Sequence, residues 1–139
     1  MRIILSGLFP VLVGMLLLTA CETDNATLLT DGVWTFQSMT TDSDDSSIIS
    51  LVSLGQALLT EATMEFQEGG TYILDSPLLE NPTTGEWELI GDDQLFLDPD
   101  NEVSSTSKIE TLTKDKLSYS ETFVDQQMNT YEITSTWTR

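Results

Sequence analysis

The side chains that could do chemistry in this sequence are mainly carboxylates, since its 139 residues include 23 Asp and Glu but no His. Without His, the chain lacks the commonest general base and the commonest metal ligand, and its Ser and Thr residues lack the usual activating partner. Glycine loops of the Walker or Rossmann type are absent as well. A carboxylate pair for glycoside hydrolysis stays open, because spacing across strands cannot be read from a sequence. We therefore expect no enzyme activity and no cofactor.

Two short acidic segments have the oxygen-rich pattern that Ca²⁺ prefers. Asp98–Glu102 places side-chain oxygens at alternate positions, and Asp42–Asp45 is similar. Both lack the glycine and the length of an EF-hand loop, so we interpret them as solvated loops and predict no metal site. The net charge of −18 argues against nucleic acid as a partner, because the phosphates would be repelled.

The first twenty residues have the layout of a signal peptide. Met1-Arg2 is a short positive segment, Ile3–Leu18 is almost entirely apolar, and small residues precede the only cysteine, Cys21. The apolar run is shorter than the roughly 20 residues of a membrane span and contains a proline. We expect a signal peptide at 1–20, a polar tether at 21–30 and one domain at 31–139.

Leu18-Thr19-Ala20-Cys21 resembles the lipobox of bacterial lipoproteins. The resemblance implies that the Cys21 thiol is acylated and that cleavage leaves this residue first. Each buried methylene of an acyl chain contributes about 0.8 kcal/mol, so we expect a lipid-anchored protein of the bacterial cell envelope, at the outer membrane. Glu22 and Asp24 resemble surface-export signals, and the membrane leaflet stays open. A secreted protein with one free thiol is the alternative.

From Gly32 onward, apolar and polar residues alternate as they do in strands. Ser47–Ala62 differs, because its apolar residues have helical spacing, and Asp44 and Asp45 can cap its N-terminus. We predict a helix there, with an additional pair of strands as the alternative. The apolar stripe expected to pack on the sheet comprises Ile48, Leu51, Val52, Leu58 and Leu59. The eight predicted strands are Val33–Thr40, Thr63–Gln67, Thr71–Asp75, Glu86–Ile90, Gln94–Asp98, Ser105–Thr113, Lys116–Val124 and Asn129–Thr138.

Eight consecutive strands are best accommodated by an all-β, antiparallel up-and-down barrel, which removes the unpaired edges. An even number of strands makes the last antiparallel to the first, so the two can pair. Arg139 should then lie over the ring of Trp34, which follows Gly32 near the start of the first strand. The indoles of Trp34 and Trp137 should together seal this end of the barrel. Ligand access is expected at the opposite end.

Several side chains are expected to face the barrel interior and could line a ligand site. Glu121 shares a face with Tyr119 and Phe123, and a buried carboxylate needs a partner or a raised pKa. Glu121 is therefore a candidate for orienting a ligand, with an outward bulge or a position in water as the alternatives. The lining candidates are Trp87, Tyr119, Glu121, Phe123, Tyr131 and Trp137.

Gly32-Val33-Trp34 and Gly85-Glu86-Trp87 each place an aromatic two residues after a glycine, and Gly70-Thr71-Tyr72 is a tyrosine version. We interpret each glycine as permitting a tight turn into its strand. With Arg139 at the end, the pattern resembles the lipocalin-like domain of small bacterial lipoproteins, over about residues 28–139. The chain lacks the C-terminal helix and disulfides of longer lipocalins. Transport of a hydrophobic ligand is therefore not carried over from the family. An eight-stranded barrel can hold one small ligand, so we expect a site for a small apolar or amphipathic ligand; an acidic module that docks a cationic protein is the alternative.

Overall fold

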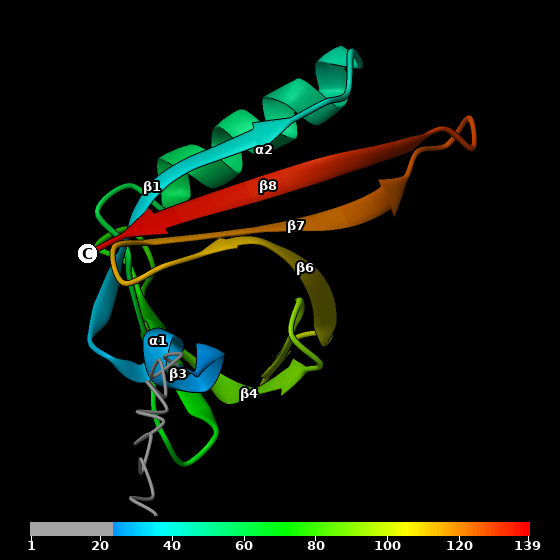
Figure 1. Cartoon of the computed structure of the whole chain (residues 1–139). Helices are drawn as coiled ribbons and strands as arrows, with labels where there is room; N and C mark the ends of the chain where they lie inside the picture. Colours follow the sequence, from blue (N-terminus) through cyan, green and yellow to red (C-terminus); the bar gives the residue numbers. More distant parts are fainter. Residues whose placement is uncertain (1–23) are drawn as a thin grey trace, which may run out of the picture.

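Eight antiparallel strands close into a barrel in which each strand pairs with its neighbours along the chain and β8 returns to β1 (Figure 1). The computed structural model describes residues 24–139, so the predicted signal peptide and Cys21 lie outside the described residues. The predicted fold class is confirmed. The strands are β1 (Val33–Thr41), β2 (Thr63–Phe66), β3 (Thr71–Asp75), β4 (Thr83–Ile90), β5 (Gln94–Pro99), β6 (Ser105–Leu112), β7 (Lys116–Val124) and β8 (Thr130–Thr138).

The last part of the expected tether belongs to the fold instead. Asn25–Thr30 forms α1, and its Leu29 is fully buried. The Trp34 indole N–H donates to the Leu29 carbonyl oxygen at 3.0 Å, and Asn25 Nδ2 donates to the carbonyl oxygen of Asp92 at 3.0 Å. The prediction of a tether is therefore wrong for this stretch. The mostly polar composition of this stretch predicted a tether. One buried leucine and one hydrogen bond from an indole nevertheless hold the short helix against the barrel.

The helix α2 (Ser46–Leu58) covers an edge of β1 that β2 does not reach. β1 pairs with β2 through Val33–Thr35 and with β8 through Thr35–Thr41. Beyond Thr35, the Met39 backbone N–H donates to Gln56 Oε1 of α2 at 3.2 Å. Because an unpaired strand edge invites pairing with other chains, α2 protects the barrel at this position.

The predicted helix between the first two strands is confirmed, although it ends earlier than expected. The prediction was Ser47–Ala62, and the helix spans Ser46–Leu58. Asp45 caps it, as its Oδ1 accepts from the Ser47 backbone N–H at 2.7 Å. The chain leaves the helix before Ala62 because a short turn is needed to lead it into β2.

The apolar stripe of α2 is only partly buried. Ile48 and Val52 are buried, and Leu59, just after the helix, packs against the core. Leu51 and Leu58, however, are 58% and 40% exposed. The prediction that the whole stripe packs on the barrel is wrong at these two leucines, because the successive 100° rotations of a helix place them beside the buried face rather than on it.

One end of the barrel is where β1 begins and β8 stops, and we call it the Arg139 end. The Arg139 guanidinium lies over the Trp34 ring, with Cζ 4.1 Å from the ring centroid. Its nitrogens donate to the carbonyl oxygens of Asp31 and Lys114. Gly32, at φ +114°, makes the turn into β1 beside the arginine. The predicted β1–β8 pairing and the ring contact are both confirmed.

The aromatic packing behind this end differs from the predicted pair of indoles. Trp137 lies opposite Phe36 in the strand register, and the two rings meet edge to face with centroids 5.2 Å apart. Trp34 is held by Leu29 and Arg139 instead. The seal therefore combines α1, an indole and a guanidinium, because α1 reaches this end.

Gly85 lies within β4 and does not open it, contrary to the interpretation from sequence. A Cβ at this position would be 2.4 Å from the Asp98 carbonyl oxygen and 2.9 Å from Tyr72 Cε1. The glycine therefore makes room for the Tyr72 ring, which is buried opposite it on β3. Burial, together with the nearby Glu102 carboxylate, raises the pKa of Tyr72 to about 12.

Candidate functional site

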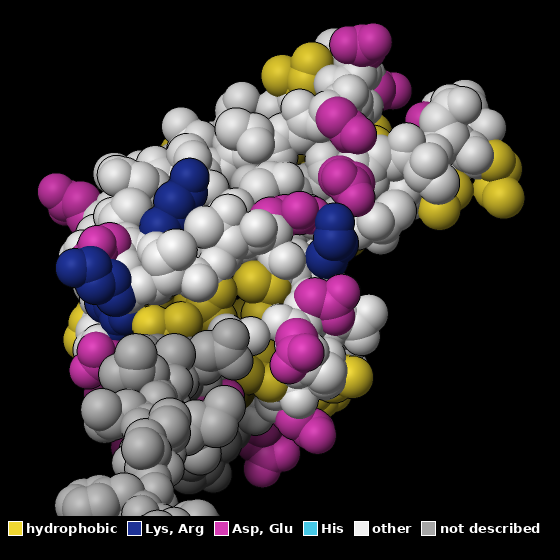
Figure 2. Space-filling view, in the orientation of Figure 1, with side chains coloured by type: hydrophobic (Ala, Val, Ile, Leu, Met, Phe, Trp, Pro, Cys, Tyr) yellow, Lys and Arg dark blue, Asp and Glu magenta, His cyan; other side chains and the backbone are white. Residues whose placement is uncertain are grey.

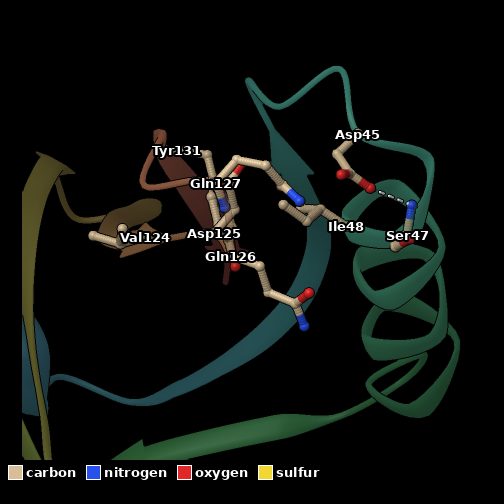
Figure 3. Close-up of a pocket in the computed structure, with 8 residues that line it drawn as sticks. All are labelled: Asp45, Ser47, Ile48, Val124, Asp125, Gln126, Gln127 and Tyr131. Carbon is tan, nitrogen blue, oxygen red and sulfur yellow. Dashed lines mark hydrogen bonds between the residues drawn. The ribbon is translucent and has the colours of Figure 1, made fainter.

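The other end of the barrel is the hairpin end, where the turn Asp125–Asn129 joins β7 to β8 and α2 begins. In Figure 1 the β7–β8 hairpin extends beyond the curved strands on the side away from the C-terminus. Between this hairpin and the first turn of α2 lies a cleft of 370 Å³ (Figure 3). Its lining residues are Asp45, Ser47, Ile48, Val124, Asp125, Gln126, Gln127 and Tyr131.

A second hollow of 330 Å³ adjoins the cleft on the side of the loop between β1 and α2. The two share Asp45, Asp125, Gln127 and Tyr131, so they form one continuous recess at the hairpin end. The residues that line the second hollow are Asp42, Ser43, Asp44, Asp45, Asp125, Gln127, Asn129, Thr130 and Tyr131.

The carboxylates on the α2 side of the recess are held by backbone N–H groups. Asp45 caps α2, and Asp42 Oδ1 accepts from the Glu132 backbone N–H at 2.7 Å. The Asp42 backbone N–H in turn donates to the Glu132 carbonyl oxygen at 3.4 Å. This exchange continues the β1–β8 pairing past the last residue of β1 and fixes the loop that forms one wall.

The hairpin turn on the other side is organised by Asp125. Its Oδ1 accepts from the backbone N–H groups of Gln127 at 2.9 Å and Asn129 at 2.8 Å. Its Oδ2 accepts from Asn129 Nδ2 at 3.1 Å. The bonds from Asn129 and Gln127 hold the pKa of Asp125 below its usual value, because they favour the charged form. Met128, at φ +66°, completes the turn and projects into solvent.

The apolar surface of the recess comes from both sides. Ile48 of α2 lies opposite Tyr131 of β8 (Figure 3). Behind Tyr131, the Phe123 ring stacks on it with centroids 5.6 Å apart and planes 23° from parallel. Aliphatic and aromatic surface, amide groups and carboxylates therefore meet in one recess, which suits a molecule with an apolar body and a polar or cationic group.

The predicted lining residues of β7 and β8 separate into two groups. Phe123 and Tyr131 belong to the hairpin end. Glu121 lies two residues before Phe123 on β7, opposite Ile133, and is half-buried. Tyr119 faces the core, where burial raises its pKa above the ordinary value.

Trp137 and Trp87 lie away from the recess. Trp137 packs in the core. Trp87 lies near the Arg139 end, where its indole N–H donates to the Gln67 carbonyl oxygen at 3.0 Å and its ring meets Phe66 edge to face. The structure thus brings Phe123 and Tyr131 together as candidates and gives Trp87 and Trp137 packing roles, while the ligand role of each stays a prediction.

The lining residues that sequence reasoning missed come from the first turn of α2 and from the hairpin turn. Ser47, Gln126 and Gln127 were not singled out, and Ile48 was expected only to pack on the sheet, because neither a capped helix start nor a polar turn indicates which segment will lie opposite it. The acidic pattern at Asp42–Asp45 was the one available signal. Within residues 24–139, no three acidic side chains gather closely enough to hold a metal ion. In the same range, no helix is long and apolar enough to cross a membrane.

Three comparisons relate this chain to known proteins. A comparison with curated proteins finds no match. Among solved structures, a DUF4847 family protein from Bacteroides vulgatus ATCC 8482 is similar, with 12% identity, a TM-score of 0.47, and coverage of 77% of this chain and 93% of that one. A family model described as a lipocalin-like domain matches residues 30–119. Since this match spans well over half of the sequence and most of the barrel, the chain belongs to the lipocalin-like domain family.

Proposed function

We propose that this protein is a non-catalytic binding protein, anchored through lipid on Cys21 at the bacterial outer membrane, that holds a small amphipathic ligand in the recess at the hairpin end. The observation that supports the ligand site is the 370 Å³ cleft, a size within the roughly 300–1,000 Å³ of small-molecule sites. Ile48 and Tyr131 would contact the apolar part of the ligand. Gln126 and Gln127 would bind its polar part.

The direction of the chain supports this arrangement. The described residues begin at Asp24, three positions after Cys21, and α1 then packs on Trp34 near the Arg139 end. An anchor on Cys21 would thus place the membrane closest to that end. The recess lies at the other end of the strands, where a ligand can reach it from the aqueous side.

Ligand binding is tested by native mass spectrometry of the processed protein after gentle extraction. We expect a retained small molecule, and its loss or at least tenfold weaker rebinding in Tyr131→Ala. Thr106→Ala, on an exposed position of β6, is the matched control and should bind normally. A Tyr131→Ala protein that binds as well as wild type would place the ligand elsewhere, and a wild-type protein that carries and rebinds nothing would reject the function.

Anchoring is tested separately by metabolic labelling with palmitate. The wild-type chain should be labelled and should fractionate with the outer membrane. Cys21→Ser should be unlabelled and should accumulate as soluble or unprocessed protein. A cleaved Cys21→Ser product that stays in the membrane would contradict the lipid anchor.

Docking of a cationic protein is the second candidate function, and the distribution of charge favours it. The four Lys and Arg side chains of the described region lie on β6, in the β6–β7 turn, at the start of β7 and at the C-terminus. In the view of Figure 2, dark-blue side chains appear at the left and centre, and none appears at the hairpin tip at the upper right. The hairpin end therefore attracts cations without a local positive charge to oppose them. The four cationic residues are Lys108, Lys114, Lys116 and Arg139.

A further inference from the structure

The exposed flank of α2 is the feature that the ligand recess does not account for. Leu51, Leu54 and Leu58 follow one another at intervals of three and four residues, and their exposed fractions are 58%, 57% and 40%. Residues at this spacing form a continuous row on one side of a helix. We call this row the leucine stripe. Leu78, 61% exposed, follows Ser76, whose hydroxyl donates to the Leu58 carbonyl oxygen at 2.6 Å, so the row has further apolar surface at its end.

The charged residues next to the leucine stripe in the sequence are all negative. The stretch from residue 46 to residue 60 has no charged side chain in a protein of net charge −18. Carboxylates border it, with Asp44 and Asp45 before the helix and Glu61 after it. None of the four described Lys and Arg residues belongs to α2, β1, β3 or the loops that connect them. An apolar row with carboxylates at both ends and no cation on its own elements is complementary to an apolar row with cations beside it.

We propose that the leucine stripe is a docking site for a cationic amphipathic helix of another protein, which packs its apolar side chains against the three leucines and directs Lys or Arg at the flanking carboxylates. An amphipathic helix that docks through residues at i, i+3 and i+7 matches this spacing. This inference rests on the second candidate function and names the surface and the partner class. It does not depend on the ligand recess.

Two other occupants fit the observations less well. A second copy of the chain would bring two surfaces of the same negative sign together, since the flanking groups of the stripe are carboxylates in both copies. A bilayer would lie near the Arg139 end if Cys21 is the anchor. The stripe runs along α2 from Leu58, which is nearest that end, toward the hairpin end, so such a bilayer would face one end of the stripe and not its length. Acidic flanks would also be repelled by anionic headgroups.

The test uses a labelled synthetic peptide of about five helical turns with Leu on one face and Lys on the other. Fluorescence anisotropy measures its binding to the full processed chain in nanodiscs of zwitterionic lipid, with empty discs subtracted. We expect the double variant Leu51→Ser, Leu54→Ser to weaken binding at least tenfold, and raised salt to weaken it further. Val103→Ser is the matched control, because Val103 is an apolar residue that is 90% exposed and lies in the loop between β5 and β6, not on α2.

Two further peptides separate the docking surface from charge alone. A Leu/Glu peptide should not bind, and an oligolysine of equal length should bind at least tenfold more weakly than the Leu/Lys peptide. Equal binding of oligolysine, or equal binding of the Leu/Lys peptide to the double variant, would overturn the proposal. So would a lack of binding accompanied by a dimer, in sedimentation, that the double variant abolishes.

A photo-crosslinkable leucine in the peptide tests the location on the wild-type chain, without relying on a variant. The crosslinks should map to residues 46–60, and crosslinks confined to other segments would contradict the proposal. Tyr131→Ala separates the two functions, since it should leave peptide binding unchanged while it weakens the small-molecule ligand. Loss of both on this single change would mean that the recess, and not the stripe, binds the peptide.

Discussion

The two ends of the barrel use polar groups in opposite ways. At the Arg139 end, the guanidinium covers a fully buried indole and donates to two carbonyl oxygens, so its hydrogen bonds lie over the core. At the hairpin end, Asp125 and Asp45 accept backbone N–H groups of local turns, and their side chains border open space. The first arrangement holds distant segments of the chain together. The second shapes local turns, apart from the Asp42–Glu132 exchange between distant segments, and leaves their surface available for binding.

Trp34→Ala has the largest expected effect and breaks the Arg139 end. It removes a fully buried indole, its hydrogen bond to Leu29 and the ring beneath Arg139. We expect a loss of about 3–5 kcal/mol in the free energy of unfolding, measured by denaturant titration. Phe123→Ala is the matched change at the hairpin end, and its loss should be clearly smaller because the ring is 37% exposed. Equal losses in the free energy of unfolding would show that the two ends contribute equally to global stability.

Gly85→Ala tests the packing around the Tyr72 ring by adding volume, whereas Trp34→Ala removes it. The new methyl would meet the backbone of Asp98 and the Tyr72 ring at 2.4 and 2.9 Å, so we expect a loss of about 1–3 kcal/mol. Gly69→Ala is the control, because a Cβ there has no neighbour within 4 Å. A stability of Gly85→Ala equal to that of Gly69→Ala would refute the close contact between this glycine and the tyrosine ring.

The Arg139 end was largely predictable from sequence, and the hairpin end was not. Alternation of apolar residues gives the strands, an even number of antiparallel strands brings the first and last together, and the position of Trp34 near the start of β1 then requires Arg139 beside it. These steps use local periodicity and pairing rules that leave little choice.

The recess depends instead on where one loop and one helix settle against each other. Ile48 and Tyr131 are far apart in sequence, and no periodicity relates them. Leu51 was misplaced for a similar reason, since a broad apolar stripe on α2 does not say how much of it the barrel can cover. The role of α1 was missed because six mostly polar residues carry too weak a pattern to predict a docked helix.

Arg139→Ala gives an intermediate effect and isolates the guanidinium. It removes the contact with Trp34 and the hydrogen bonds to Asp31 and Lys114, so we expect a loss of about 1–3 kcal/mol. Arg139→Lys keeps the charge but cannot supply the planar fork, and should recover only part of that loss in the same titration. Full recovery by lysine would mean that the charge over the ring is sufficient and that the two hydrogen bonds add nothing.

Asp125→Ala has the smallest expected effect on global stability, because the carboxylate organises one turn. We expect faster hydrogen exchange at the Gln127 and Asn129 amides, which lose their acceptor, with an unfolding midpoint close to that of wild type.

Acid should have the same local effect on the wild-type turn. The folded-state pKa of Asp125 is below its usual value, so its contribution is present above the unfolded pKa and is lost as the pH falls through the lower, folded pKa. The matched control is Asp115→Ala in the β6–β7 turn, which should leave exchange at Gln127 and Asn129 unchanged. If Asp125→Ala lowered the unfolding midpoint as much as Arg139→Ala does, the hairpin end would contribute to the global fold, and the contrast between the two ends would fail.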